Sequence, residues 1–128
     1  MKCELIFYYS GKTRLCETAL ERSLADTGLR LCGSRYAADP EALGRELINA
    51  FDAVNVVFIV GDSAAELMSC ALADKAPDDV KKLRGRDADG FLVRCKGQLL
   101  VILPDSPGEI SEIFGEELLS YFGKFTET

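Results

Sequence analysis

The sequence predicts a three-layer α/β/α sandwich on a mostly parallel sheet, with one antiparallel strand from a C-terminal hairpin. Apolar runs of strand length alternate along the chain with segments of helical periodicity, an order that implies right-handed crossovers between two helical layers. Near the C-terminus, two apolar runs are separated only by residues 96–98, which include a glycine, and this spacing predicts a β-hairpin. The 128 residues are expected to form one α/β domain, residues 1–128.

Five short apolar runs are expected to form the strands of this sheet. The run 54–60 is rich in β-branched residues and nearly all apolar, so it is placed at the centre. The other expected strands are residues 5–9, 29–32, 91–95 and 99–103. The stretch 74–89 is the least hydrophobic part of the chain and is expected to be an exposed connection, with a helical turn at most.

The first expected helix spans residues 13–27 and is amphipathic. Its apolar positions Cys16, Leu20 and Leu24 recur every four residues, and Gly28 ends the helix. Cys16 is therefore expected to be a buried structural thiol, since no base that could activate it is in view.

The other expected helices begin at capping residues. Asp39 caps the second helix and Pro40 takes its first position. Residues 63–66 and 106–109 have the spacing of capping boxes, in which a Ser and a Glu satisfy backbone N–H groups at the start of a helix. Glu109 is expected on a different face of the last helix from its apolar stripe.

The charge balance and the residue types present exclude several function classes. The chain has 15 Lys and Arg against 21 Asp and Glu, a net charge of −6, so it repels polyphosphates and no nucleic acid partner is expected. The chain contains no histidine, which excludes a Ser-His-Asp triad and histidine-based zinc sites. We therefore assign no catalytic residue and no metal ligand, and we favour a protein that is not an enzyme.

Hydropathy and cysteine usage predict the compartment. No apolar run reaches the roughly 20 residues that a membrane span needs, so no membrane association is expected. The five cysteines are odd in number and form no C-x-x-C pair, which is typical of free thiols in a reducing compartment. We expect a cytoplasmic protein without a signal peptide.

The turn after the first strand has two other interpretations. Gly11, Lys12 and Thr13 resemble the end of a P-loop, but Ile6 stands where that motif needs a glycine, so no P-loop is expected. Residues 8–11 precede a helix as the phosphate loop of flavodoxins does, although the loop is too short to wrap an FMN phosphate. A shortened flavodoxin-like domain stays open as an alternative.

Three segments in order resemble one known group of proteins. Residues 99–110 read LLVILPDSPGEI and are similar to the strand, the L-P-G-x-P turn and the helix start of the MoaB/MogA and CinA families. Residues 38–61 are similar to their D-D-P-E, amphipathic helix and D-x-V-I-x-T-G-G, and the helix before Gly28 resembles their first helix. The resemblance implies the molybdopterin-binding fold, molybdopterin binding and, in the MogA branch, Mg-ATP-dependent adenylation.

The loops depart from the family where it binds phosphate. The family's G-G-x-G-P-T turn is replaced by residues 61–66, which read GDSAAE, and the glycine after its Leu-Pro is Asp105 here. Glycine lets backbone N–H groups approach an anion, whereas Asp62 and Asp105 bring charges that repel one by about 1 kcal/mol at 4 Å in water. A Mg²⁺ ion held by Asp39, Asp62 and Asp105 would reverse that sign; chance surface acids are the alternative.

The predicted site lies at the C-terminal ends of the parallel strands, where open α/β sheets bind ligands. We predict a molybdopterin- or nucleotide-binding domain, with Mg²⁺ if any ion takes part, related to molybdenum cofactor biosynthesis and CinA-type proteins. Its altered loops predict weak or no catalysis. The alternative on the same fold is a non-enzymatic module for oligomerisation or protein interaction, and a homo-oligomer, dimer or trimer, is expected. The predicted ligand-binding residues are Ser10, Gly11, Lys12, Thr13, Asp39, Gly61, Asp62, Ser63, Glu66, Pro104, Asp105, Ser106 and Pro107.

Overall fold

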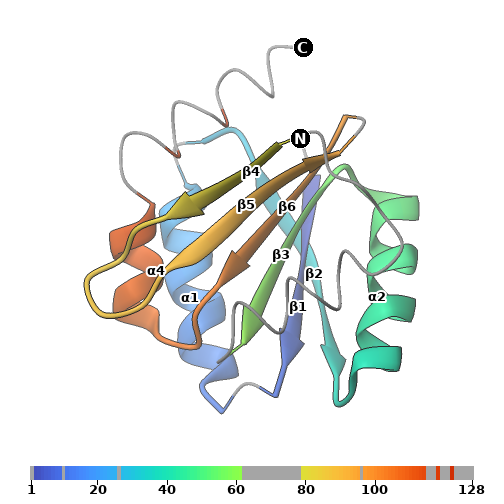
Figure 1. The fold of residues 1–128 in the computed structure, drawn as a ribbon, viewed down its shortest axis with the longest axis horizontal. Coiled ribbons are helices and arrows are strands. Elements are labelled where there is room, and N and C mark those ends of the chain that lie inside the picture. Colours follow the sequence, from blue (N-terminus) through green and yellow to red (C-terminus); the bar gives the residue numbers. More distant parts are fainter. Residues whose placement is uncertain are drawn as a thin grey trace.

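The computed structural model describes residues 2–9, 11–25, 27–61, 79–95, 97–114, 118 and 122. The described elements alternate as the sequence predicts (Figure 1). In chain order they are β1 (Lys2–Tyr8), α1 (Thr13–Leu24), β2 (Arg30–Ala37), α2 (Pro40–Ala53), β3 (Val56–Gly61), β4 (Asp79–Leu83), β5 (Gly90–Cys95), β6 (Gln98–Leu103) and α4 (Pro107–Ile113). The helix expected to begin at Ser63 lies outside the described residues.

The strands form one sheet in the order β2-β1-β3-β6-β5-β4. β1 pairs in parallel with β2 and β3, and β3 pairs in parallel with β6. β5 is antiparallel to both β6 and β4, so it alone among the described strands runs against the others. The mostly parallel sheet, its single antiparallel strand and the C-terminal hairpin β5–β6 are therefore confirmed. β3 is buried along its whole length and lies inside the sheet, as its β-branched run predicts.

The expectation that the stretch 74–89 lacks a strand is wrong. Its residues 79–83 form β4, which pairs with β5 at the outer edge of the sheet. Only Leu83 of this strand is buried, while Lys82 is exposed. An edge strand has one neighbour and needs few apolar residues, and lysines on it oppose pairing with other chains. Its charged composition therefore hid the strand.

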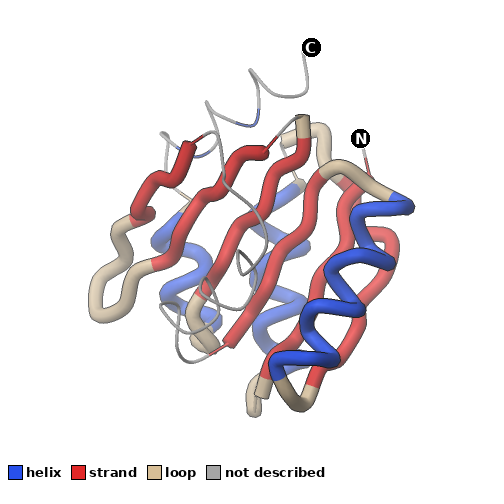
Figure 2. Tube along the Cα trace, turned by 45° about the vertical axis from the view of Figure 1, so that its right-hand side comes forward, coloured by secondary structure: helices blue, strands red, loops and turns tan. Residues whose placement is uncertain are grey.

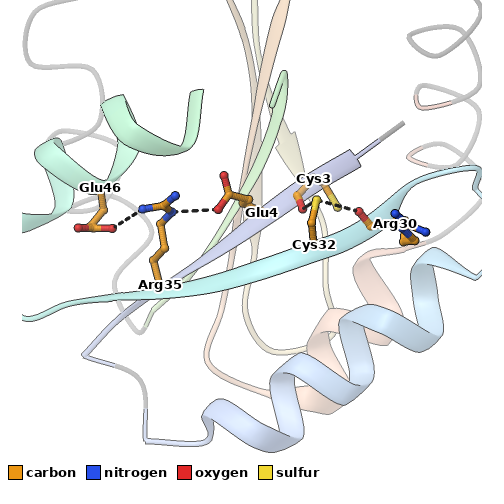
Figure 3. Close-up of polar contacts among 6 residues, drawn as sticks. All are labelled: Cys3, Glu4, Arg30, Cys32, Arg35 and Glu46. Carbon is orange, nitrogen blue, oxygen red and sulfur yellow. Dashed lines mark hydrogen bonds and ion pairs between the residues drawn. The ribbon is translucent and has the colours of Figure 1, made fainter. Parts of the chain in front are cut away.

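β2 is also longer than the four residues expected from its apolar run. It extends to Ala37 because Arg35 finds partners on both neighbouring elements: Glu4 of β1 at 2.9 Å and Glu46 of α2 at 3.2 Å (Figure 3). α1, by contrast, ends at Leu24 rather than Thr27. Gly28 lies beyond it with a φ of 81°, a left-handed conformation that glycine adopts without strain.

The helices lie in two layers, with α1 and α4 on one face of the sheet and α2 on the other (Figures 1 and 2). On the first face, Phe58 of β3 packs against Phe114 and Phe122 with ring centroids 6.0 and 5.9 Å apart. On the second face, Leu43 and Leu47 of α2 pack on the sheet. The three-layer architecture is therefore confirmed. Within the described part of the chain, no helix has the length and apolar character needed to cross a membrane.

Candidate ligand-binding edge of the sheet

The C-terminal edge of the sheet is the edge at which β1, β2, β3, β4 and β6 end, and the arrowheads of these strands point toward the lower part of Figure 1. The register aligns the strand ends, since Tyr8 pairs with both Ala37 and Gly61, and Val60 pairs with Leu103. The described segments that follow β1, β2 and β6 therefore begin at neighbouring strand ends. Several predicted site residues lie in them.

Asp105 joins two of these loops. Its Oδ2 accepts a hydrogen bond from the backbone N–H of Gly11 at 2.9 Å, and its Oδ1 accepts one from the Cys16 thiol at 3.4 Å. Gly11 follows β1 and Asp105 follows β6, and β3 lies between those two strands. The carboxylate therefore reaches across the end of β3 to the loop that starts α1.

Cys16 is buried, as its place in the apolar stripe of α1 predicts. The acceptor of its thiol proton, Asp105, is 89 residues away and was not foreseen. The contact therefore makes Cys16 part of the scaffold that holds Asp105.

Asp39 caps α2, as predicted. Its Oδ1 accepts from the N–H of Ala42 at 2.7 Å, and Pro40 occupies the first helical position. The carboxylate is thus directed onto its own helix. Among the described residues, no three acidic or cysteine side chains are grouped to hold a metal ion, and Asp62, the third residue of the predicted Mg²⁺ set, lies outside them.

The capping box predicted for the last helix is wrong. Pro107 takes the first position of α4 as expected, but no side-chain hydrogen bond from Ser106 caps the described helix. The carboxylate of Glu109 instead accepts the N–H groups of Arg86 at 2.8 Å, Asp87 at 3.1 Å and Ala88 at 3.5 Å. Such a run of converging N–H groups is an anion-binding concavity, and here it is filled from within the chain.

Glu109 is consequently buried, at 9% exposure, although the sequence placed it away from the apolar stripe. Gly85 makes this possible, since a Cβ there would overlap both Ala88 O and Glu109 Oε2. Glu109 ties the β4–β5 loop to α4, and Asp89 of this loop forms an ion pair at 3.2 Å with Lys82 of β4. No local pattern signals a pairing of residues more than 20 positions apart.

Four other predicted site residues lie at the starts or ends of the described elements. Lys12 is exposed at the N-cap position of α1 and makes no side-chain cap there, and Thr13 is the first helical residue. Gly61 and Pro104 are buried at the ends of β3 and β6. Four predicted residues lie outside the described part of the chain: Ser10, Asp62, Ser63 and Glu66.

Tyr9 was not predicted as a site residue. It follows β1 with a φ of 51°, a left-handed conformation that is uncommon for a residue with a Cβ. Its side chain is 66% exposed, and its ring meets that of Tyr8 edge-on, with centroids 4.8 Å apart. The C-terminal edge therefore presents an exposed aromatic ring two residues from Gly11.

A second polar cluster lies away from this edge, inside the sheet (Figure 3). Hydrogen bonds to Glu4 and then Glu46 raise the pKa of Arg35 above its ordinary value. Beside it, burial raises the pKa of the Cys3 thiol from 9.0 to about 12, while the thiol of Cys32 donates to the backbone oxygen of Cys3 at 3.4 Å. Cys32 is exposed, unlike Cys3. The apolar residues around Cys32 in the sequence do not predict this exposure, which arises because β2 lies at the edge of the sheet.

Comparison with known proteins identifies the fold through structure rather than sequence. No protein-family model and no curated protein sequence matches the chain significantly. The molybdopterin biosynthesis enzyme MoaB of Thermus thermophilus superposes with a TM-score of 0.68 at 14% identity over 96% of each chain. CinA of Thermoplasma acidophilum gives a TM-score of 0.66 at 14% identity, again over 96% of each chain. MogA gives 0.68 at 17% identity over 97% of this chain and 98% of its own. The chain therefore has the α/β fold of MoaB, MogA and CinA.

Proposed function

We propose that this domain binds a pterin- or nucleotide-type small molecule at the C-terminal edge of its sheet, with weak or no catalysis. The proposal joins the fold shared with molybdopterin biosynthesis proteins to one observation. Asp105, which stands at the glycine of the family's L-P-G-x-P turn, accepts the N–H of Gly11 with its carboxylate. This supports an edge that keeps the strand and loop arrangement of the family but carries a negative charge where the family has a glycine.

The altered charge supports the loss of catalysis. Adenylyl or phosphoryl transfer depends on positive or neutral donors around a phosphate, such as glycine N–H groups at a helix start. Two like charges about 4 Å apart repel by about 1 kcal/mol in water and by several times that at a drier site. The chain also has no histidine to act as a general base.

A thermal-shift series with molybdopterin, AMP, Mg-ATP and FMN tests the binding proposal. A ligand at about one hundred times its Kd stabilises the folded protein by about 2.7 kcal/mol, which raises the Tm of a domain of this size by several degrees. We expect a rise with molybdopterin or a nucleotide, or with the phosphate-free compounds adenosine and neopterin, which complete the series. A rise with FMN alone would favour the flavodoxin-like alternative, and no rise with any of these compounds at millimolar concentration would contradict the proposal.

A non-enzymatic module that self-associates is the second candidate. The exposed large apolar side chains of the described residues are Tyr9, Leu15, Tyr36, Ile48 and Val80. A dimer or trimer would remove such side chains from water at about 25 cal/mol per Å². Light scattering tests this directly: an oligomer gives two or three times the chain mass of 14.0 kDa, and a monomer at all concentrations contradicts it.

The remaining proposals concern location and partners. We propose a cytoplasmic location, which suits the free thiols of Cys3, Cys16 and Cys32. The net charge of −6 disfavours nucleic acid as a partner. Fractionation of cells that express the tagged chain would check the location.

A further inference from the structure

We propose that Asp105 makes the C-terminal edge selective for ligands that carry no phosphate, so that a free pterin or a nucleoside binds better than its phosphate ester. This inference rests on the proposed function and adds the charge state of the ligand and the residue that selects for it. It follows from the backbone N–H groups that the carboxylates of the edge already bind.

Three carboxylates occupy backbone donors across this edge, from one side of the sheet to the other. At the end of β2, Asp39 accepts a hydrogen bond from the N–H of Ala42, which lies in the first turn of α2. Over the end of β3, Asp105 accepts one from the N–H of Gly11. Beyond β6, Glu109 accepts hydrogen bonds from N–H groups of the β4–β5 loop. Donors of these kinds are the ones that bind phosphate in α/β proteins, and each of these groups already faces an anion of the chain itself.

Asp105 is the member of this set that lies between the strand ends, and it is held at both oxygens. Displacing it would break the bond from Gly11 and the bond from the Cys16 thiol together. Pro104 and Pro107 flank it and restrict the backbone on either side. A phosphate entering here therefore meets a fixed negative charge rather than one that swings aside.

The same carboxylate suits an uncharged heterocycle. Pterin and purine rings carry amino and ring N–H donors, which a carboxylate accepts, and they have flat faces that stack on aromatic side chains. The exposed ring of Tyr9 offers such a face two residues from Gly11. The ammonium of Lys12 is nearby but solvent-exposed, so its attraction for phosphate is screened by water and salt.

Isothermal titration calorimetry with matched probes tests the inference: adenosine against AMP, and neopterin against its phosphate ester. For the wild-type protein we expect the phosphate-free member of at least one pair to bind about tenfold more tightly, equal to about 1.4 kcal/mol. Asp105→Asn keeps an acceptor for Gly11 but removes the charge, so it should remove most of that preference. Asp105→Gly restores the family's residue and serves as the second variant if the first one folds poorly by circular dichroism.

Asp52→Asn is the matched control. Asp52 is exposed near the C-terminal end of α2, the end opposite Asp39, so this variant loses the same unit of charge far from the edge. An equal change in both variants would overturn the inference, because bulk charge would then explain the preference. Wild-type protein that binds phosphate esters as tightly as the free compounds would overturn the inference and leave the proposed function standing. No binding of any probe, to wild type or to either Asp105 variant, would overturn both.

Discussion

The ionisable groups at the C-terminal edge and those inside the sheet are satisfied in different ways. At the edge, Asp39, Asp105 and Glu109 each accept backbone N–H groups. Inside the sheet, Glu4 is as buried as Glu109, at 8% against 9% exposure, yet it is held by the side chain of Arg35 through Oε1. Its Oε2 is buried without a hydrogen-bond partner.

The difference separates two ways in which the fold satisfies a carboxylate. The edge carboxylates accept hydrogen bonds from N–H groups that loops and helix starts leave without backbone partners. The charges inside the sheet instead allow a polar segment to continue as β2 at the margin of an apolar core. Changes in the two regions should therefore differ in size and in kind.

The largest effect is expected from a titration inside the sheet. The Cys3 thiol has a pKa of about 12 when folded against 9.0 in its ordinary state, chiefly because it is buried. Between these values the unfolded chain loses the proton and the folded chain keeps it, so the free energy of unfolding falls as pH rises. The total fall due to Cys3 is about 4 kcal/mol.

Urea unfolding across this alkaline range, compared between wild type and Cys3→Ala, measures the effect. The variant is less stable at neutral pH because of its cavity, but its stability should fall less steeply above pH 9.0. Parallel slopes for the two proteins would mean that Cys3 ionises in the folded state as readily as in the unfolded one.

At the edge, Glu109→Ala is expected to destabilise the fold by about 2 kcal/mol, because the part-buried hydrogen bonds from the N–H groups of Arg86 and Asp87 lose their charged acceptor. Glu112 is exposed on the same helix, so Glu112→Ala should change stability by less than about 0.5 kcal/mol. Chemical unfolding measures both. Equal effects would show that Glu109 does not organise the loop.

Glu4→Gln should lower the free energy of unfolding by about 1 kcal/mol. This is less than the loss expected for Glu109→Gln, although both residues are almost equally buried. Only one oxygen of Glu4 is hydrogen-bonded, and Arg35 retains Glu46 at 3.2 Å in the variant. A double-mutant cycle with Arg35→Met isolates the Glu4–Arg35 coupling. A larger loss at Glu4 than at Glu109 would break the contrast between the two regions.

The effect expected at Asp39 is as small as that of Glu4→Gln. Replacing this N-cap with alanine should destabilise the protein by about 1 kcal/mol, since only the Ala42 N–H loses its side-chain acceptor. Asp39→Asn, which still caps, should be nearly neutral. A loss well above this size in thermal unfolding would mean that Asp39 also supports another loop of the edge.

Sequence reasoning reached the parts of this fold that local chemistry specifies. The apolar run of β3 predicted a central strand, and Asp39 with Pro40 predicted the start of α2. It missed β4, whose edge position tolerates a charged composition. It also misread Glu109, because spacing favoured a capping box while the fold offered three N–H groups from a distant loop.

The location of the candidate site could be predicted from the sequence, but its hydrogen bonds could not. Parallel strands bring their C-terminal ends together whatever residues follow, so the edge could be named from the order of the elements. The contact from Gly11 to Asp105 spans 94 residues and depends on the register of three strands. Tyr9 gave no signal, because an exposed left-handed tyrosine has no sequence pattern of its own.

The most direct test of the account follows the backbone amide of Gly11 by NMR while inorganic phosphate is added. With Asp105 holding this N–H at 2.9 Å, the wild-type Gly11 resonance should show no saturable shift at millimolar phosphate. In Asp105→Asn the same titration should move it, because the negative charge that excludes phosphate is gone. A saturable shift of Gly11 in the wild-type protein would contradict the claim that the chain's own carboxylate takes the place of a ligand anion.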